Sequence, residues 1–153
     1  MNRLIAILGD LSQWLHFHRV ANRSARRILI VDDEAPMRQF LHTVLTTAGY
    51  DSVVACDGPD ALATLEREGP FDVIVTDVMM PQMRGYELAQ RARRLESTVK
   101  VLYVTGFSDA LFKEKPQLSA DEAFLEKPCT PDRLLQTLSQ LVGGQVRHKI
   151  VWG

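Results

Sequence analysis

The sequence predicts an α/β protein in which five parallel strands form one sheet between two layers of helices. Short runs rich in valine and isoleucine alternate with segments of helical spacing from residue 27 onward. Such runs are typical of strands that are covered on both faces of a sheet. Five strand–helix units joined by right-handed crossovers form a doubly wound, three-layer sandwich. A chain of 153 residues is most simply one such domain.

The first unit begins with an apolar strand at residues 27–31. Its helix carries apolar residues at spacings of three and four from Met37 to Leu45. Gly49 follows, as a glycine commonly does at the C-terminal end of a helix.

The second unit pairs a strand near 52–56 with a helix near 60–67, which Gly69 and the following proline end. The third unit has a strand near 72–76 and a helix near 86–95. Both helices repeat apolar residues at helical spacing, which predicts one buried face each.

The fourth unit has a strand near 99–104 and a helix near 108–117 that a proline shortens. The last strand is expected near 122–125. The final helix begins at Pro131, a favourable first-turn position, with Thr130 as its cap.

Composition excludes several classes of function. A net charge of −1 gives no general attraction to nucleic acid or to an anionic membrane. No apolar run reaches the roughly 20 residues that span a bilayer. The N-terminal apolar stretch is interrupted at Gly9 and has no small-residue cleavage site before Arg19, so we expect it to be retained in a cytoplasmic protein. Cys56 and Cys129 form no C-x-x-C pair, so we expect two reduced thiols.

Polar residues follow the strands where each strand ends. Asp32 and Asp33 follow the first strand, Asp77 the third, Thr105 the fourth and Lys127 the fifth. The carboxyl ends of parallel strands gather at one crevice, so these residues should converge. Crowded carboxylates cost energy and therefore indicate a bound cation, whereas the lysine and the hydroxyl suit an anion.

This ordered set resembles the receiver domain of response regulators in bacterial two-component signalling, over about residues 26–142. The resemblance rests on Val31-Asp32-Asp33-Glu34, Thr76-Asp77-Val78-Met79-Met80-Pro81, Val104-Thr105-Gly106 and Phe124-Leu125-Glu126-Lys127-Pro128. The sequence is similar to single-domain chemotaxis-type regulators and to the C-terminal receivers of hybrid histidine kinases. This resemblance implies a flavodoxin-like fold with strand order 2-1-3-4-5.

The resemblance implies that Asp77 accepts a phosphoryl group from a phosphohistidine of a histidine kinase or phosphotransfer protein. In-line attack by its carboxylate would give an acyl phosphate. Mg²⁺, with Mn²⁺ as an alternative, suits the oxygen ligands of Asp33, Asp77 and the backbone carbonyl of Met79. Asp32 would act directly or through a bound water. The chain is expected to be a phosphoacceptor rather than an enzyme.

Lys127 and the Thr105 hydroxyl would contact the phosphoryl oxygens, and Gly106 would leave room for one of them. The family resemblance also implies a cis peptide bond between Lys127 and Pro128. It implies a switch in which Thr105 moves inward on phosphorylation and Phe124 follows.

A downstream protein is expected to bind near Phe107, Phe124 and the last helix. The sequence leaves open whether the chain forms a homodimer. No nucleic-acid partner is expected, because no helix-turn-helix length follows residue 142. Met79 and Phe107 are apolar where a polar side chain could orient an attacking water. We therefore expect slow self-dephosphorylation, and a half-life of seconds would count against it.

The two ends of the chain fall outside the pattern. Residues 1–25 are an extension that is either an amphipathic helix or a flexible tail, because apolar residues repeat at helical spacing between Leu4 and Leu15. Residues 26–142 form the expected receiver domain, and 143–153 a short tail.

Three alternatives remain. The chain is equally compatible with a receiver module of a hybrid histidine kinase phosphorelay. An aspartate-nucleophile phosphohydrolase of the haloacid dehalogenase type places an Asp-x-Asp pattern after its first strand, whereas Asp32 and Asp33 are adjacent and Asp77 is isolated. A pseudo-receiver that never takes phosphate is disfavoured by the full acidic set.

Overall fold

The computed structural model describes residues 26–143, so the extension at 1–25 and most of the predicted tail lie outside the described residues. The described part alternates strands and helices from end to end. The elements are β1 Arg27–Val31, α2 Ala35–Thr47, β2 Asp51–Ala55, α3 Gly58–Glu68, β3 Val73–Thr76, α4 Gly85–Leu95, β4 Lys100–Thr105, α5 Ser108–Glu114, β5 Glu122–Glu126 and α6 Pro131–Val142. Within this part, no helix has both the length and the apolar character needed to cross a bilayer.

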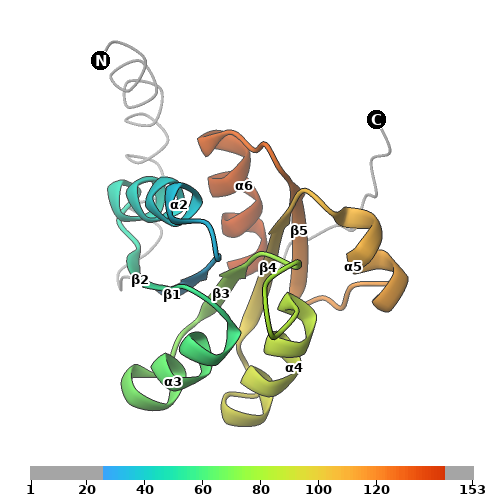
Figure 1. The fold of residues 1–153 in the computed structure, drawn as a ribbon. Coiled ribbons are helices and arrows are strands. Elements are labelled where there is room, and N and C mark those ends of the chain that lie inside the picture. Colours follow the sequence, from blue (N-terminus) through green and yellow to red (C-terminus); the bar gives the residue numbers. More distant parts are fainter. Residues whose placement is uncertain (1–25, 144–153) are drawn as a thin grey trace.

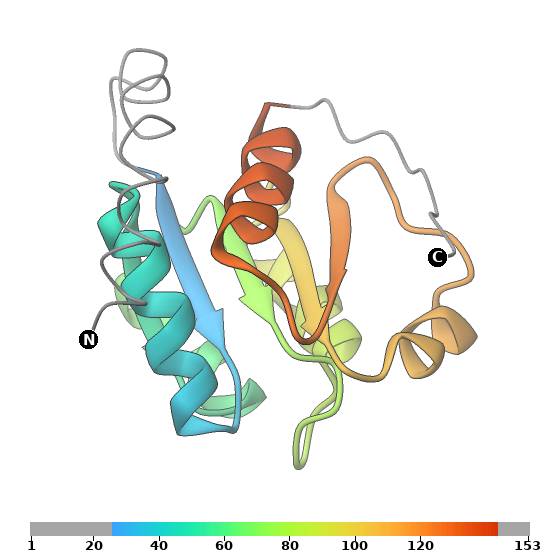
Figure 2. The same ribbon diagram turned by 90° about the horizontal axis from the view of Figure 1, so that it is seen from above.

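The strands form one parallel sheet in the order β2-β1-β3-β4-β5, which confirms the predicted topology. Helices α2 and α6 cover one face, and α3 and α4 cover the other (Figure 1). Helix α5 joins the α4 side, where Leu111 packs with Ala89 and Tyr103. Figure 2 shows the same layers from above, and β3 is the middle strand, with β1 and β4 on either side of it.

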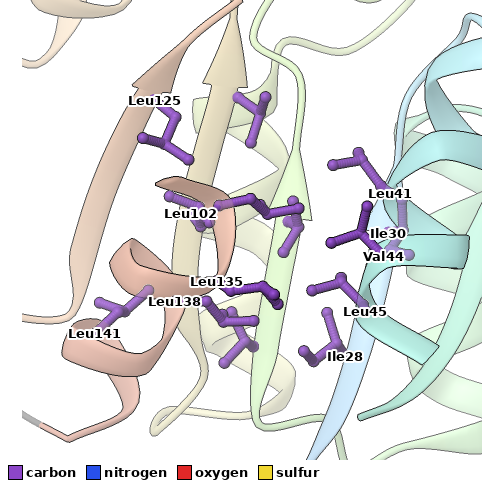
Figure 3. Packing of buried hydrophobic residues seen from close by; sticks show 14 of the residues in the cluster. Ile28, Ile30, Leu41, Val44, Leu45, Leu102, Leu125, Leu135, Leu138 and Leu141 are labelled. Atoms are coloured by element: carbon purple, nitrogen blue, oxygen red, sulfur yellow. The ribbon is translucent and has the colours of Figure 1, made fainter. Parts of the chain in front are cut away.

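The core is divided by the sheet. Alternate residues of a strand point to opposite faces. Ile28 and Ile30 therefore pack towards α2 and α6, as Figure 3 shows, while Leu29 and Val31 pack towards α3 and α4. All four side chains are completely buried. Burial of each contributes roughly 1.5–3 kcal/mol, so β1, an interior strand, is a firmly packed base for the residues that follow it.

The helix ends follow local chemistry. Gly49 has a φ of 93°, the left-handed conformation that favours glycine, directly after α2. The Thr130 hydroxyl accepts a hydrogen bond from the Arg133 amide at 3.2 Å and caps α6, as predicted. Helix α3 begins at Gly58, earlier than the apolar pattern suggests, because the Asp57 carboxylate accepts from the Asp60 amide at 2.8 Å.

Candidate functional site

Three carboxylates converge at the carboxyl ends of β1 and β3. One oxygen each from Asp32, Asp33 and Asp77 lies within 4.8 Å of the others. The strands are neighbours, and the Asp77 amide donates to the Val31 carbonyl at 3.0 Å, which extends the pairing to the site. The sequence-predicted acidic residues are therefore brought together by strand pairing.

Asp32 is the most deeply placed of the three, with 1% of its surface exposed. Its carboxylate accepts from the Lys127 ammonium at 2.8 Å and from the Glu34 amide at 2.9 Å. Burial raises the pKa of Asp32; these two hydrogen bonds offset part of the rise, and the neighbouring charge of Asp77 adds to it. The Arg38 guanidinium also donates to the Asp32 carbonyl at 2.7 Å, which fixes the backbone at this point.

Asp77 is buried, and its two oxygens have different partners. Oδ1 accepts from the Val78 amide at 2.7 Å, and Oδ2 accepts from the Lys127 ammonium at 3.2 Å. Lys127 thus bridges Asp32 and Asp77. Burial alone would lower the pKa of Lys127, but the two carboxylates raise it, so the ammonium keeps its charge. Asp77 is held as an oriented carboxylate beside a fixed cation.

The donor set fits a hard divalent cation. All three side chains offer oxygen, which Mg²⁺ and Mn²⁺ prefer over softer ligands. Lys127 bonds only Asp32 and Asp77 of the three, and Asp33 is exposed, so the cluster has an unbalanced carboxylate that opens to solvent. Met79, whose carbonyl is the expected further ligand, lies two residues beyond Asp77 in the loop before α4.

Replacement of Asp33 by asparagine should stabilise the metal-free protein and remove its response to Mg²⁺. Asp33 makes no salt bridge within residues 26–143, yet its charge lies close to two others. Relief of this solvent-screened repulsion is worth about 0.5 kcal/mol. Thermal unfolding with and without Mg²⁺ checks this: Asp33→Asn should raise Tm without Mg²⁺ and lose the Mg²⁺-induced rise. The exposed Asp121→Asn is the control, and an unchanged Mg²⁺ response in Asp33→Asn would contradict the assignment.

Thr105 ends β4 beside the lysine. Its side chain is fully buried and accepts from the Phe107 amide at 3.0 Å, which leaves the hydroxyl proton available to a ligand oxygen. The Lys127 amide donates to the Thr105 carbonyl at 2.9 Å, so the two residues are held side by side. The Lys127–Pro128 peptide bond is cis. A Cβ built on Gly106 would meet no atom within 4 Å, so there is open space at this position.

Phe124 lies on the edge strand β5, and its ring is half-buried. It meets the Phe112 ring of α5 edge to face, with 4.8 Å between centroids. Its neighbours on β5, Ala123 and Leu125, point to the opposite face of the sheet, towards α6. Phe107, which precedes α5, is 61% exposed. The region named in the sequence-based expectation of a partner is the rim formed by α5, β5 and α6, and within it Phe124 packs with α5 rather than with the last helix.

A buried polar network beneath this rim was missed in the sequence. The carboxylate of Glu122, 2% exposed, accepts from the Tyr103 hydroxyl at 2.9 Å and pairs with Lys115 at 2.9 Å and Arg93 at 3.7 Å. The Ser119 hydroxyl also donates to it at 3.0 Å. The network joins β4, β5 and α4 to the end of α5. A tyrosine within an apolar strand was the available signal, because a buried phenol needs a hydrogen-bond partner.

Gly85 is a second residue whose role the sequence did not reveal. It begins α4, and a Cβ at this position would overlap the Asp77 carbonyl oxygen. Its amide donates to the Val78 carbonyl at 2.9 Å. The absence of a side chain therefore lets the start of α4 pack directly against the backbone of the candidate nucleophile.

Fold and site together define a receiver module. Residues 28–139 match the family model described as the response regulator receiver domain. This chain belongs to that family.

Curated relatives contain a matching segment within chains of different length. The chain is 36% identical over 103 residues to the response regulator receiver protein CpdR of Brucella abortus, covering 67% of this chain and 85% of CpdR. It is 41% identical to the sensor histidine kinase RcsC of Salmonella typhi over 73% of this chain, but spans only 12% of RcsC. It is 39% identical to a probable transcriptional regulator, ycf27, of Porphyridium aerugineum. That match covers 71% of this chain and 44% of ycf27.

Solved structures agree with the fold. The chemotaxis protein CheY4 of Vibrio cholerae superposes with a TM-score of 0.67 at 31% identity, covering 77% of this chain and 99% of CheY4. The receiver domain of the hybrid histidine kinase CckA gives a TM-score of 0.64 at 29% identity, covering 76% of this chain and 98% of that domain.

Proposed function

We propose that this chain is a phosphoacceptor that takes a phosphoryl group from a phosphohistidine onto Asp77 and signals to a protein partner. The observation that supports this most is the Lys127 ammonium, which is shared by the buried Asp32 and Asp77 beside the open carboxylate of Asp33. A structural ion pair needs one carboxylate per lysine. Three around one lysine leave negative charge that a metal would balance.

The transfer uses Asp77 as nucleophile. A carboxylate oxygen of Asp77 attacks phosphorus, the P–N bond of the partner's phosphohistidine breaks, and its electron pair returns to the imidazole nitrogen. Bound Mg²⁺, held by Asp33, Asp77, the Met79 carbonyl and Asp32, would neutralise charge on the transferring group. Lys127 and the Thr105 hydroxyl would bind two phosphoryl oxygens, and the space at Gly106 would admit them.

The conformational readout would run from Thr105 to Phe124. Movement of the Thr105 hydroxyl onto a phosphoryl oxygen would break its bond with the Phe107 amide. Phe107 and the Phe112–Phe124 pair would then repack at the rim of α5, β5 and α6, where a protein partner would bind. Slow self-dephosphorylation remains our expectation, since Met79 and Phe107 bring no polar side chain to an attacking water.

A second candidate is a receiver module of a hybrid histidine kinase phosphorelay. The likeness to a segment of the sensor kinase RcsC and to the receiver of CckA supports it. The chemistry at Asp77 is the same in both settings, and only the donor and the output differ.

Incubation with acetyl phosphate tests the chemistry without a cognate kinase. We expect intact-mass spectrometry to show the addition of one phosphoryl group in Mg²⁺ or Mn²⁺, and no addition when EDTA removes the metal. Hydroxylamine should reverse the modification, because it cleaves acyl phosphates. Absence of modification with metal would support a pseudo-receiver, and steady turnover of a phosphate ester would support a hydrolase.

A further inference from the structure

The guanidinium of Arg84 has little to bind within its own domain. Arg84 is the residue before α4, and its amide is already taken by the Glu87 carboxylate at 2.9 Å. Its side chain is half-buried, and the guanidinium Nη1 lies 2.9 Å from the Met79 sulfur. A thioether is a weak acceptor, whereas a guanidinium has five N–H donors.

Two other arginines near the sheet, Arg27 and Arg38, are better satisfied. Arg27 bonds the carbonyls of Glu68 and Pro70 and the carboxylate of Asp51, and Arg38 bonds the Asp32 carbonyl. Arg84 makes no salt bridge within residues 26–143. Most of its donor capacity is therefore available to an anion, and release of the sulfur contact costs little.

Arg84 borders the approach to the acidic cluster. A hollow of about 700 Å³ is lined by Arg84 together with Met79, Asp33 and Phe107. Asp33 belongs to the carboxylate cluster, and Phe107 follows the Thr105 strand end. The Arg84 side chain therefore shares a hollow with Asp33, one of the three carboxylates of the cluster.

The charge balance gives this arginine a role. Lys127 is already bonded to two carboxylates, yet a phosphoryl group would bring further negative charge to the same place. The planar fork of a guanidinium matches two phosphoryl oxygens, and charge-assisted bonds of this kind are stronger than neutral ones. We propose that Arg84 is a second cationic contact for the phosphoryl group at Asp77, an inference that rests on the proposed function.

The test compares three variants of the full chain. Arg84→Gln removes the charge, and Arg84→Lys keeps the charge but not the fork. Arg91→Gln removes an exposed charge on α4, the helix that Arg84 precedes. Beryllofluoride with Mg²⁺ serves as the phosphoryl analogue, and its half-saturating concentration is read from the rise in Tm. We expect about a tenfold weaker response in Arg84→Gln, an intermediate one in Arg84→Lys and the wild-type value in Arg91→Gln.

The outcomes separate this contact from the proposed function. A response of Arg84→Gln within about twofold of wild type would overturn the contact while leaving Asp77 as the phosphoacceptor. Equal losses in Arg84→Gln and Arg91→Gln would overturn it as well, because the effect would then be one of net charge. A wild-type chain that responds neither to beryllofluoride nor to acetyl phosphate would refute the proposed function and this contact together. Thermal unfolding without ligand establishes that each variant is folded.

Discussion

Replacement of Asp77 by asparagine should abolish phosphorylation by acetyl phosphate while leaving the domain folded. The amide has no anionic oxygen to attack phosphorus, and it also removes a carboxylate from the expected metal site. The Val78 amide keeps its acceptor, because an asparagine oxygen can replace Oδ1, and Lys127 keeps Asp32. Intact-mass spectrometry in Mg²⁺ measures the loss directly.

The matched control is Asp121→Asn, an equal change of charge at an exposed residue before β5. It should be modified as fast as wild type. A phosphoryl group retained in Asp77→Asn would move the nucleophile to another carboxylate, and peptide mapping would locate it.

Replacement of Glu122 by alanine should lower the free energy of unfolding by about 3 kcal/mol, because it breaks a buried polar network. The change leaves the fully buried Tyr103 hydroxyl without its acceptor. It also leaves Lys115 and Arg93 without their shared carboxylate partner. The two cations are about a quarter exposed and can turn to water, which keeps the loss below that of a fully buried pair. Urea unfolding measures it.

A charge effect can be separated from a packing effect with Glu122→Gln. The amide keeps the shape and can still accept from Tyr103, so the loss should be smaller than for alanine. Glu114→Ala, an exposed change at the end of α5, should alter stability by less than about 0.5 kcal/mol. Equal stability of Glu122→Ala and wild type would show that the network does not hold the rim.

The stability difference between wild type and Glu122→Gln should depend on pH. Burial alone would raise the pKa of Glu122, but hydrogen bonds from Lys115 and Tyr103, with the charge of Arg93, bring it below its ordinary value of 4.5. A lowered carboxyl pKa stabilises the fold above the unfolded-state value and loses that contribution as pH falls through the folded-state value. The stability difference between wild type and Glu122→Gln should therefore shrink below pH 4.5. Asp32 has a raised pKa, so its contribution to stability changes with pH in the opposite direction. Both proteins contain Asp32, so this contribution cancels in their stability difference.

The sequence predicted the sheet well because strand burial and helix spacing are local signals. Residues 28–31 are apolar without interruption, a pattern typical of a short strand whose two faces are both covered. The acidic cluster followed from topology, since Asp32 and Asp77 come directly after two parallel strands whose carboxyl ends lie side by side.

What the sequence could not predict depends on side-chain reach across elements. Glu122 appears as an ordinary polar residue at the start of a strand. Two of its partners, Tyr103 and Arg93, lie on other elements far along the chain, and Lys115 and Ser119 reach it from the loop between α5 and β5. The position of the Arg84 guanidinium depends on how the loop before α4 folds over Met79. Gly85 is recognisable as necessary only when the Asp77 carbonyl is seen against it.

The placement of β1 and β3 has a consequence for motion. Each has a hydrogen-bonded neighbour on both sides, whereas β5 has one neighbour and α5 is only seven residues long. Amide hydrogens of Ile28–Val31 should exchange with solvent only when the whole domain opens, and those of α5 should exchange through local fluctuations. The carboxylate cluster thus follows strands whose backbone should open only rarely, whereas α5, the part of the rim beside Phe124, should open more often.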